Sequence, residues 1–291
     1  MEWLNAILQG ILLGGLYALL ATGLSLVFGV MRIVNLAQGD LTILAAFVSL
    51  TIVRLTGLGP IESLLAVVPL MMVLGWVMQR YLLDRTLGRG VLPPVLVTFG
   101  LAIVLQNVLL YGYTADSRGL DAGPIETASI QLLPQLTVGV LPVVTLVVAV
   151  AILLGLQFML SRTRLGRALR ATSDDAETAT LMGINDRRMY AVAMAIALGT
   201  VAVAGVFLGI RTTFGPADGP ARLIFAFEAV IIGGLGSLWG TLVGGMVLGV
   251  AQTVGNQVAP AYQILAGHLV FLIVLAFRPS GLFAPASARQ S

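Results

Sequence analysis

Three polar residues near the amino terminus lie close together where little else in the sequence could do chemistry. Asn35, Gln38 and Asp40 separate two long apolar runs. Amide and carboxylate groups at membrane depth are costly and usually face a bundle interior or a cavity, where they can bind a polar solute. In a turn at the membrane surface, headgroups and water would satisfy the same groups. The sequence leaves both interpretations open: the lining of a translocation path, or an interfacial turn.

The sequence lacks the residues that enzymatic catalysis, metal binding or ATP hydrolysis would need. The chain has no cysteine, and its sixteen basic residues are all arginine, so thiol chemistry, cysteine metal sites and a P-loop lysine are excluded. The single histidine, His268, lies in an apolar run with no charged neighbour in the sequence, which favours a packing role over a proton relay. We therefore expect no enzyme, no catalytic residue, no metal and no cofactor. Any ATP-driven work must come from another subunit.

The composition indicates a protein whose surface faces lipid. Hydrophobic residues make up 58% of the 291 residues and charged residues 10%, and the mean hydropathy is +1.00. Soluble domains carry about 25% charged residues, which this chain lacks. The net charge of +3 could indicate a nucleic-acid partner, but the arginines lie in short gaps between apolar runs, where a membrane protein needs them. The sequence predicts an all-α, polytopic integral membrane protein that does not bind nucleic acid.

Apolar runs of sufficient length recur along the whole chain. A bilayer core about 30 Å thick needs about 20 apolar residues in a helix. On this measure we expect roughly eight transmembrane helices in a single transmembrane domain spanning residues 1–291. The expected spans are Ala6–Phe28, Leu36–Val53, Ile61–Leu83, Val91–Tyr111, Val138–Leu160, Tyr190–Ile210, Phe225–Val250 and Ala261–Phe277.

The seventh of these spans is interrupted by glycine. Gly233, Gly234, Gly236 and Gly240 divide Phe225–Val250. One continuous span would put the carboxyl end outside the cell, whereas two half-spans or a re-entrant pair would put it inside. Broken helices at membrane depth are tolerated only where protein or a water-filled cavity buries the freed backbone. The glycines that follow, from Gly244 to Gly249, are better explained by close helix packing than by a hinge.

The loops differ in charge, and this predicts the topology. Arginines are dense in Arg80–Arg89 and in Ser161–Met189, whereas Gly112–Thr137 contains three acidic residues and one arginine. Cytoplasmic loops carry an excess of arginine and lysine. We therefore expect the two basic segments inside the cell, and the acidic segment and the amino terminus outside.

The second basic segment also contains a short helix. Asp174 and Asp175 precede a helical run, where acidic groups suit the helix dipole, and Gly183 is a typical helix end. An ordinary basic loop would explain the charge alone. The pattern favours a short amphipathic helix held below the membrane between two spans.

At these residues a family resemblance becomes visible. Glu177-Thr178-Ala179, three residues, then Gly183 resembles the EAA-type coupling loop of ABC importer permeases. The wider string LGRALRA…LMGIN is similar to the branched-chain amino acid permeases of the LivH type, as are GLSLVFGVMRIVNLAQGDL and VIIGGLGSLWGTLVGGMVLGVAQ. The order and spacing of these stretches cover nearly the whole chain.

The resemblance implies a multi-pass permease subunit of an ABC importer in the bacterial inner membrane. It implies a heterodimer with a second, related permease, two cytoplasmic ATPase subunits and a periplasmic substrate-binding protein. Glu177, Ala179 and Gly183 would then couple the chain to an ATPase.

Departures from the family pattern bear on the cargo. Family members commonly show histidine and glutamate where this sequence has Gln38 and Asp40, and often glutamate where it has Gln252. A branched-chain or related amino acid is the expected cargo, with urea or a short amide as an alternative within the family. The alternative from another class is a self-sufficient secondary transporter or channel for a small polar solute, which would normally carry ionisable residues within its spans.

Overall fold

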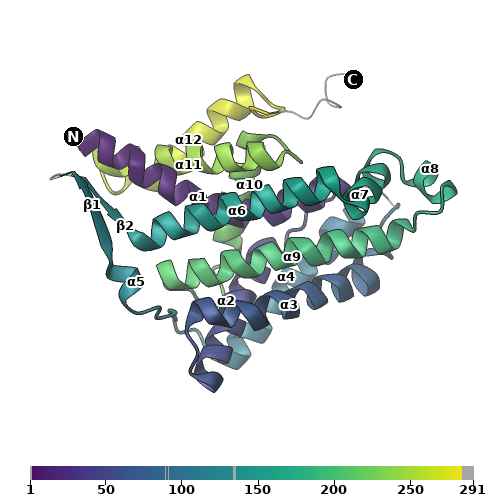
Figure 1. Ribbon diagram of the computed structural model, residues 1–291, viewed down its shortest axis with the longest axis horizontal. Coiled ribbons are helices and arrows are strands. Elements are labelled where there is room, and N and C mark those ends of the chain that lie inside the picture. The colour runs from purple at the N-terminus through teal and green to yellow at the C-terminus, as the bar shows by residue number, and fades with distance from the viewer. Residues whose placement is uncertain (1, 89, 91, 134–135, 284–291) are drawn as a thin grey trace.

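The computed structural model describes residues 2–88, 90, 92–133 and 136–283, which form an elongated bundle of helices (Figure 1). Its helices, in chain order, are α1 (Glu2–Met31), α2 (Gln38–Thr56), α3 (Pro60–Met78), the π-helical turn η1 (Gln79–Leu83), α4 (Leu92–Tyr113), α5 (Pro124–Thr127), α6 (Val140–Arg162), α7 (Arg164–Asp174), α8 (Ala176–Leu181), α9 (Asp186–Arg211), α10 (Gly219–Gly233), α11 (Leu238–Val258) and α12 (Tyr262–Phe277). Two short strands, β1 (Ser129–Leu133) and β2 (Leu136–Gly139), pair antiparallel between α5 and α6.

The helices agree with the expected all-α membrane architecture. Seven of them are long and apolar enough to cross a bilayer: α1, α2, α3 with η1, α4, α6, α9 and α11. α12 is apolar but shorter, at 16 residues. Seven of the eight expected spans coincide with one helix each, although α1 extends beyond the expected span at both ends.

The remaining expected span, Phe225–Val250, is broken. α10 ends at Gly233, and Gly234 and Gly236 adopt positive φ angles of 107° and 79° before α11 begins. A side chain would be strained at these angles, so the glycines allow the chain to reverse there. The interpretation as one continuous span is therefore wrong, because the segment forms two helices. The alternative of two half-spans is not met either, since α11, with 21 residues, is long enough to cross a bilayer. α10, with 15 residues, is too short to cross a bilayer alone.

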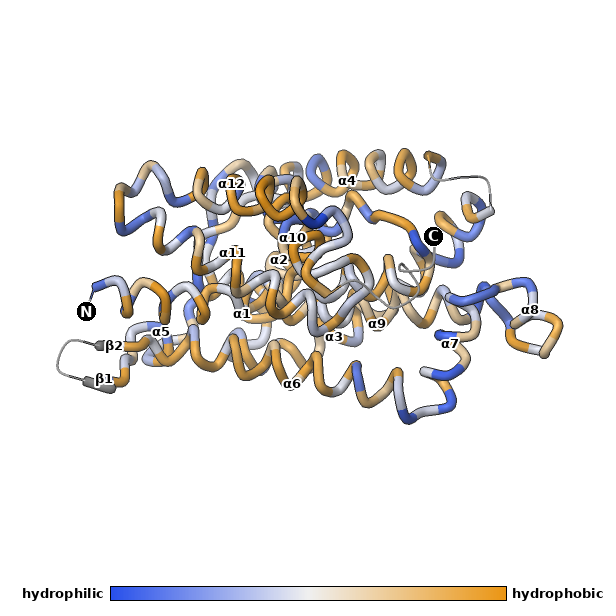
Figure 2. The backbone as a smooth tube through the Cα atoms, turned by 90° about the horizontal axis from the view of Figure 1, so that it is seen from above, coloured by the Kyte–Doolittle hydropathy of each residue, from blue (hydrophilic) through white to orange (hydrophobic). Residues whose placement is uncertain are grey.

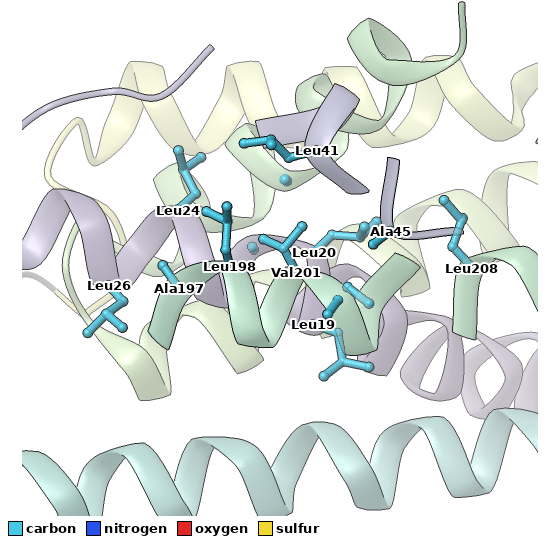
Figure 3. Close-up of a cluster of buried hydrophobic side chains, with 14 of the residues drawn as sticks. Leu19, Leu20, Leu24, Leu26, Leu41, Ala45, Ala197, Leu198, Val201 and Leu208 are labelled. Carbon is cyan, nitrogen blue, oxygen red and sulfur yellow. The ribbon is translucent and has the colours of Figure 1, made fainter. Parts of the chain in front are cut away.

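α1 and α9 form the centre of the bundle, and α3, α4 and α6 expose most of their side chains. Figure 3 shows where the central helices meet: Leu19 and Leu20 of α1 lie near Leu198 and Val201 of α9. All four side chains are at most 2% exposed. The apolar surface of the outer helices faces outward, as a bilayer requires.

α1 and α11 pack closely through small residues. A Cβ atom added at Gly245 would lie 2.7 Å from the Gly14 carbonyl oxygen, and one added at Gly249 would lie 2.2 Å from the Gly10 carbonyl oxygen. Side chains larger than hydrogen would hold the two backbones apart at these points. The expectation that these glycines serve packing is confirmed.

The bundle has two ends of different character. The hairpin end holds α5, β1 and β2 together with the amino terminus, where Gln9 Nε2 donates a hydrogen bond to the Thr137 carbonyl oxygen at 3.0 Å. The opposite end, which we call the coupling end, holds α7 and α8 (Figures 1 and 2). Hydrophilic residues gather at the coupling end in Figure 2, and α1 reaches it: Ser173 Oγ of α7 donates a hydrogen bond to the Gly29 carbonyl oxygen at 2.6 Å.

The two basic segments share the coupling end. α3 runs antiparallel to α9, because Gly75 lies against Met194 and Gly199 lies against Met72. The turn that follows α3, with Arg80 and Arg85, therefore lies beside the start of α9 and close to α7 and α8. The last described residues, Leu282 and Phe283, also lie at this end, because their N–H groups donate to Ile232 and Gly233 at the end of α10. The two-helix interpretation therefore places Phe283 on the side that the arginines assign to the cytoplasm.

We predict that the coupling end is cytoplasmic. Because the chain has no cysteine, single-cysteine variants at two exposed threonines, Thr127→Cys at the hairpin end and Thr180→Cys in α8, give labelling without background. A membrane-impermeant maleimide added to intact cells should label Thr127→Cys fully. It should label Thr180→Cys only after the membrane is permeabilised. The reverse pattern would show that the arginine asymmetry misassigns the two ends.

Candidate functional site

α2 begins inside the bundle and not at its surface. After α1 ends at Met31, the chain turns back, and the Gln38 side-chain amide comes to lie beside Gly23 of α1 and Ala197 of α9. Ala197 is near the middle of α9. Asn35, Gln38 and Asp40 are 0%, 1% and 2% exposed. The described helices therefore enclose these side chains, which do not lie in a turn at the surface of the bundle.

The first turns of α2 and α10 meet beside Asp40. The first turn of α10 lies against the first turn of α2, so closely that a Cβ added at Gly39 would lie 1.9 Å from the Gly219 carbonyl oxygen. A Cβ added at Gly219 would lie 1.9 Å from Asp40 Oδ1. Helix amino termini carry partial positive charge, which favours a carboxylate between them. Gln106 of α4 adds a hydrogen bond from its Nε2 to Asp40 Oδ1 at 2.9 Å.

Several polar atoms next to Asp40 have no partner. Asn35 Oδ1 accepts a hydrogen bond from the Ala37 N–H at 3.1 Å, but Asn35 Nδ2 and both polar atoms of Gln38 are buried without a hydrogen bond in the described part of the chain. Buried polar atoms without a partner cost about 1–3 kcal/mol each. Such atoms are expected where a solute or water passes, so the arrangement can bind a small polar molecule.

A second polar cluster lies between α1, α10, α11 and α12. The Tyr17 hydroxyl donates to Gln252 Oε1, and His268 Nδ1 is hydrogen-bonded to Glu228 Oε1. The Phe225 ring lies between them, with its centroid 5.4 Å from that of Tyr17 and 6.3 Å from that of His268. Gln252 Nε2 and Glu228 Oε2 are buried and have no partner among the described residues.

The expectation that His268 lacks a charged partner is wrong. Glu228 is 40 positions away in the sequence and on another helix. Only the packing of α12 against α10 brings the two groups together. The sequence did contain a sign of this pair: Glu228 and His268 are both ionisable residues within apolar runs, and ionisable groups inside a membrane usually pair with one another.

The coupling segment between α6 and α9 folds as two helices. Thr163 Oγ1 accepts from the Gly166 N–H at 3.0 Å at the start of α7. Asp175 Oδ1 accepts from the N–H groups of Glu177 and Thr178, at 3.0 and 3.1 Å, at the start of α8. The Thr178 hydroxyl also donates to the Asp175 carboxylate. This hydrogen bond first, and the two backbone hydrogen bonds after it, hold the pKa of Asp175 below its usual range. The carboxylate therefore stays ionised, and the cap stays formed, at neutral pH.

The sequence correctly predicted a helix between Asp175 and Gly183, but it predicted one helix where the structure has two, and Asp174 is the last residue of α7. Gly183 follows α8 with φ at 86°, and a Cβ there would meet nothing within 4 Å. Gly183 is therefore required for backbone conformation and not for lack of space. Of the other two residues of the motif, Ala179 is buried and Glu177 is exposed.

The tip of the coupling segment carries two residues that the sequence did not single out. Leu181 and Met182, at the end of α8, are 83% and 80% exposed, and α8 lies farthest along the coupling end in Figure 2. Exposed apolar side chains of this kind, surrounded by polar residues, mark contact surfaces for another protein.

The family model for the permease component of branched-chain amino acid transport systems matches residues 6–277. The chain belongs to this permease family. It is a multi-pass membrane protein and the transmembrane permease subunit of an ABC importer. The family is one of transport permeases and not of enzymes.

Individual relatives agree with this family over nearly their whole length. The chain is 30% identical to the high-affinity branched-chain amino acid transport permease BraD of Pseudomonas aeruginosa, over 97% of this chain and 95% of the relative. It is 26% identical to LivH of Escherichia coli K12, over 96% and 95%. Among solved structures, PsaBC from Streptococcus pneumoniae in complex with Fab aligns with 97% of this chain and 92% of its own at 16% identity, with a TM-score of 0.48.

The Glu228–His268 contact predicts a measurable loss of stability when it is removed. In His268→Leu the Glu228 side chain, at 4% exposed, loses its partner, which costs about 1–3 kcal/mol. We expect the melting temperature of the detergent-extracted protein to fall by several degrees. His268→Gln keeps a hydrogen-bond donor and should lose less.

Asn107→Leu is the matched control for this prediction. Asn107 is exposed on α4 and donates only to the Ile103 carbonyl oxygen of its own helix. The Asn107→Leu substitution should leave the melting temperature unchanged. Equal melting temperatures for His268→Leu and the unmodified protein would show that the contact contributes nothing to stability.

Proposed function

We propose that the chain imports branched-chain amino acids across the bacterial inner membrane, as one transmembrane domain paired with a second, related permease. The observation that carries this proposal is the full-length family match, together with relatives named for branched-chain amino acid transport. Two cytoplasmic ATPase subunits and a periplasmic binding protein complete the system. The chain itself catalyses no reaction.

The convergence of two helix amino termini inside the bundle supports a translocation path at Asn35, Gln38 and Asp40. Transporters bind anionic groups at the amino termini of discontinuous membrane helices. α2 and α10 both begin beside Asp40, and α10 is too short to span a bilayer. An amino acid carries both a carboxylate and an ammonium group. The helix termini suit the first group, and the Asp40 carboxylate suits the second.

The exposed tip of α8 supports a docking role for the coupling segment. Leu181 and Met182 offer apolar anchors, and Glu177 offers a charge beside them. A helix that lays apolar residues into a groove on its partner is a recurring mode of protein recognition. Ala179 and Gly183 then fix the shape of α8 and of the turn after it.

A reconstituted system tests the function and its rival together. The chain, its partner permease, the ATPases and the binding protein are placed in proteoliposomes, and uptake of labelled leucine, isoleucine and valine is measured. We expect uptake that requires ATP inside the vesicle and the binding protein on the opposite side. Uptake by this chain alone, driven by an ion gradient, would support a secondary transporter. Uptake of urea in place of amino acids would overturn the proposed cargo.

A tip variant shows whether α8 transmits the work of the ATPase. In the double variant Leu181→Ser and Met182→Ser, we expect the chain to remain in the membrane but to lose ATP-driven uptake. Thr180→Ser is the matched control, because its side chain is exposed on the same helix and is not apolar. Normal uptake by the double variant, at normal expression, would rule out docking at this tip.

We predict that Asp40→Asn impairs transport more than assembly. The substitution keeps the shape of the side chain and can still accept from Gln106, but it removes the charge. A hydrogen bond to a charged group is worth about 1.5–3 kcal/mol, so uptake should fall about tenfold or more. Asp116→Asn removes an exposed carboxylate at the hairpin end and should change nothing. Unchanged uptake kinetics in Asp40→Asn would exclude a role of this charge in the path.

A further inference from the structure

Two adjoining cavities lie at the coupling end, beneath α7. The smaller, of about 190 Å³, lies between the last turns of α1, α7 and the turn that joins α10 to α11. The larger, of about 560 Å³, extends outward from it between the end of α6, the start of α11 and the last described residues. Both are lined by Leu160, Arg170, Gly236 and Leu238, so they form one continuous groove, which we call the α7 groove.

The polar part of the α7 groove suits a phosphate group. Arg170 lines both cavities and takes part in no hydrogen bond or ion pair with the described residues. The amino terminus of α11, a helix of 21 residues, opens into the same place at Gly236 and Leu238. An arginine beside a helix amino terminus is a strong combination for an anionic oxygen group.

Ser25 gives an independent sign of a ligand in the smaller cavity. Ser25 lines the cavity and is 1% exposed, and its buried hydroxyl has no hydrogen-bond partner among the described residues. The hydroxyl of Thr22, one turn earlier on α1, donates to the Ala18 carbonyl oxygen of its own helix. A buried hydroxyl without a partner is expected where a bound molecule supplies one.

The outer part of the groove is apolar and open. Trp239, Leu282 and Phe283 line it and are 41%, 39% and 48% exposed. Leu282 and Phe283 are held there by hydrogen bonds from their N–H groups to Ile232 and Gly233 at 2.9 Å. Tryptophan is enriched at the level of the lipid headgroups. A ligand that fills the whole groove therefore has a polar head and an apolar body.

Asp174 indicates which chemical groups the polar head of the ligand carries. It lines the smaller cavity together with Arg170, one helical turn away on α7. A simple anion would be repelled by this carboxylate. A head group with a phosphate and a primary amine would satisfy both side chains, with the phosphate at Arg170 and the amine at Asp174.

We propose that the α7 groove binds an inner-leaflet phospholipid with a primary amine in its head group, such as phosphatidylethanolamine. The acyl chains lie against Trp239 and Phe283. The site sits between the coupling segment and the membrane helices, so the lipid holds α7 against the bundle. Free inorganic phosphate could bind Arg170 in the same way as the phosphate of a lipid. The experiment below therefore distinguishes a bound lipid from a bound phosphate ion.

The test uses the complete transporter in nanodiscs of phosphatidylcholine that contain a small fraction of phosphatidylethanolamine with a photoreactive acyl chain. After illumination, mass spectrometry locates the labelled peptides. We expect labelling of the peptides that contain Trp239 and Leu282. Arg170→Gln should reduce this labelling about fivefold, the effect of one arginine beside a lipid phosphate. Arg170→Lys should retain most of it.

Arg167→Gln is the matched control, because Arg167 is exposed on the same helix and lines neither cavity. Its labelling should equal that of the unmodified chain. Labelling spread evenly over α4 and α12, and unaffected by Arg170→Gln, would overturn the site in favour of ordinary surrounding lipid. Displacement of the probe by millimolar inorganic phosphate would overturn the lipid in favour of a soluble anion.

A second variant tests the amine. Unlabelled phosphatidylethanolamine should compete for the groove several times better than phosphatidylglycerol. Asp174→Asn should remove this preference while the labelling itself persists. An unchanged preference in Asp174→Asn would overturn the assignment of the amine to Asp174. None of these outcomes depends on which amino acid is transported.

Discussion

The structure depends on one constraint: inside a bilayer, each backbone N–H and C=O group must find its partner within the protein. The outer helices α3, α4 and α6 meet it as continuous apolar helices. α2 and α10 begin inside the bundle, and the free N–H groups of a first turn are tolerated there only because other helices bury them. These two starts lie where neighbouring helices can bury the free N–H groups, next to the polar side chains Asn35, Gln38 and Asp40.

Close packing through glycine makes this protection possible. Gly39 and Gly219 let the first turns of α2 and α10 touch, and Gly233 and Gly240 do the same for α10 and α11. Any larger side chain at these positions would separate the helices and admit lipid to the free N–H groups. The same closeness puts the Asp40 carboxylate against the start of α10. The packing glycines and the polar site are therefore parts of one arrangement.

Hydropathy and charge predicted much of the fold, because a span is a property of a single segment. Seven of the eight expected spans, the shared end of the two basic segments, and the Asp175 and Gly183 boundaries of α8 all follow from residues near one another in the sequence. Contacts between helices could not be read in this way. Two hydrogen bonds show this: the partners Gln106 and Asp40 are 66 positions apart, and the partners His268 and Glu228 are 40 positions apart. Neither pair can be predicted unless the packing of the helices is known. The depth of Asp40 was open for the same reason, since it depends on how far the chain turns back after α1.

α10 connects the candidate path with the coupling end. Its first residue, Gly219, touches Asp40, and the turn after its last residue lies beside Gly29 of α1. Ser173 of α7 is hydrogen-bonded to the same Gly29, so a displacement of α7 reaches the end of α10 through two direct contacts. α10 has 15 residues and is held at both ends by close packing. In the proposed coupling, an ATPase docked at α8 would displace α7, and these contacts would carry the displacement along α10 to its terminus at Asp40, because close-packed interiors transmit strain.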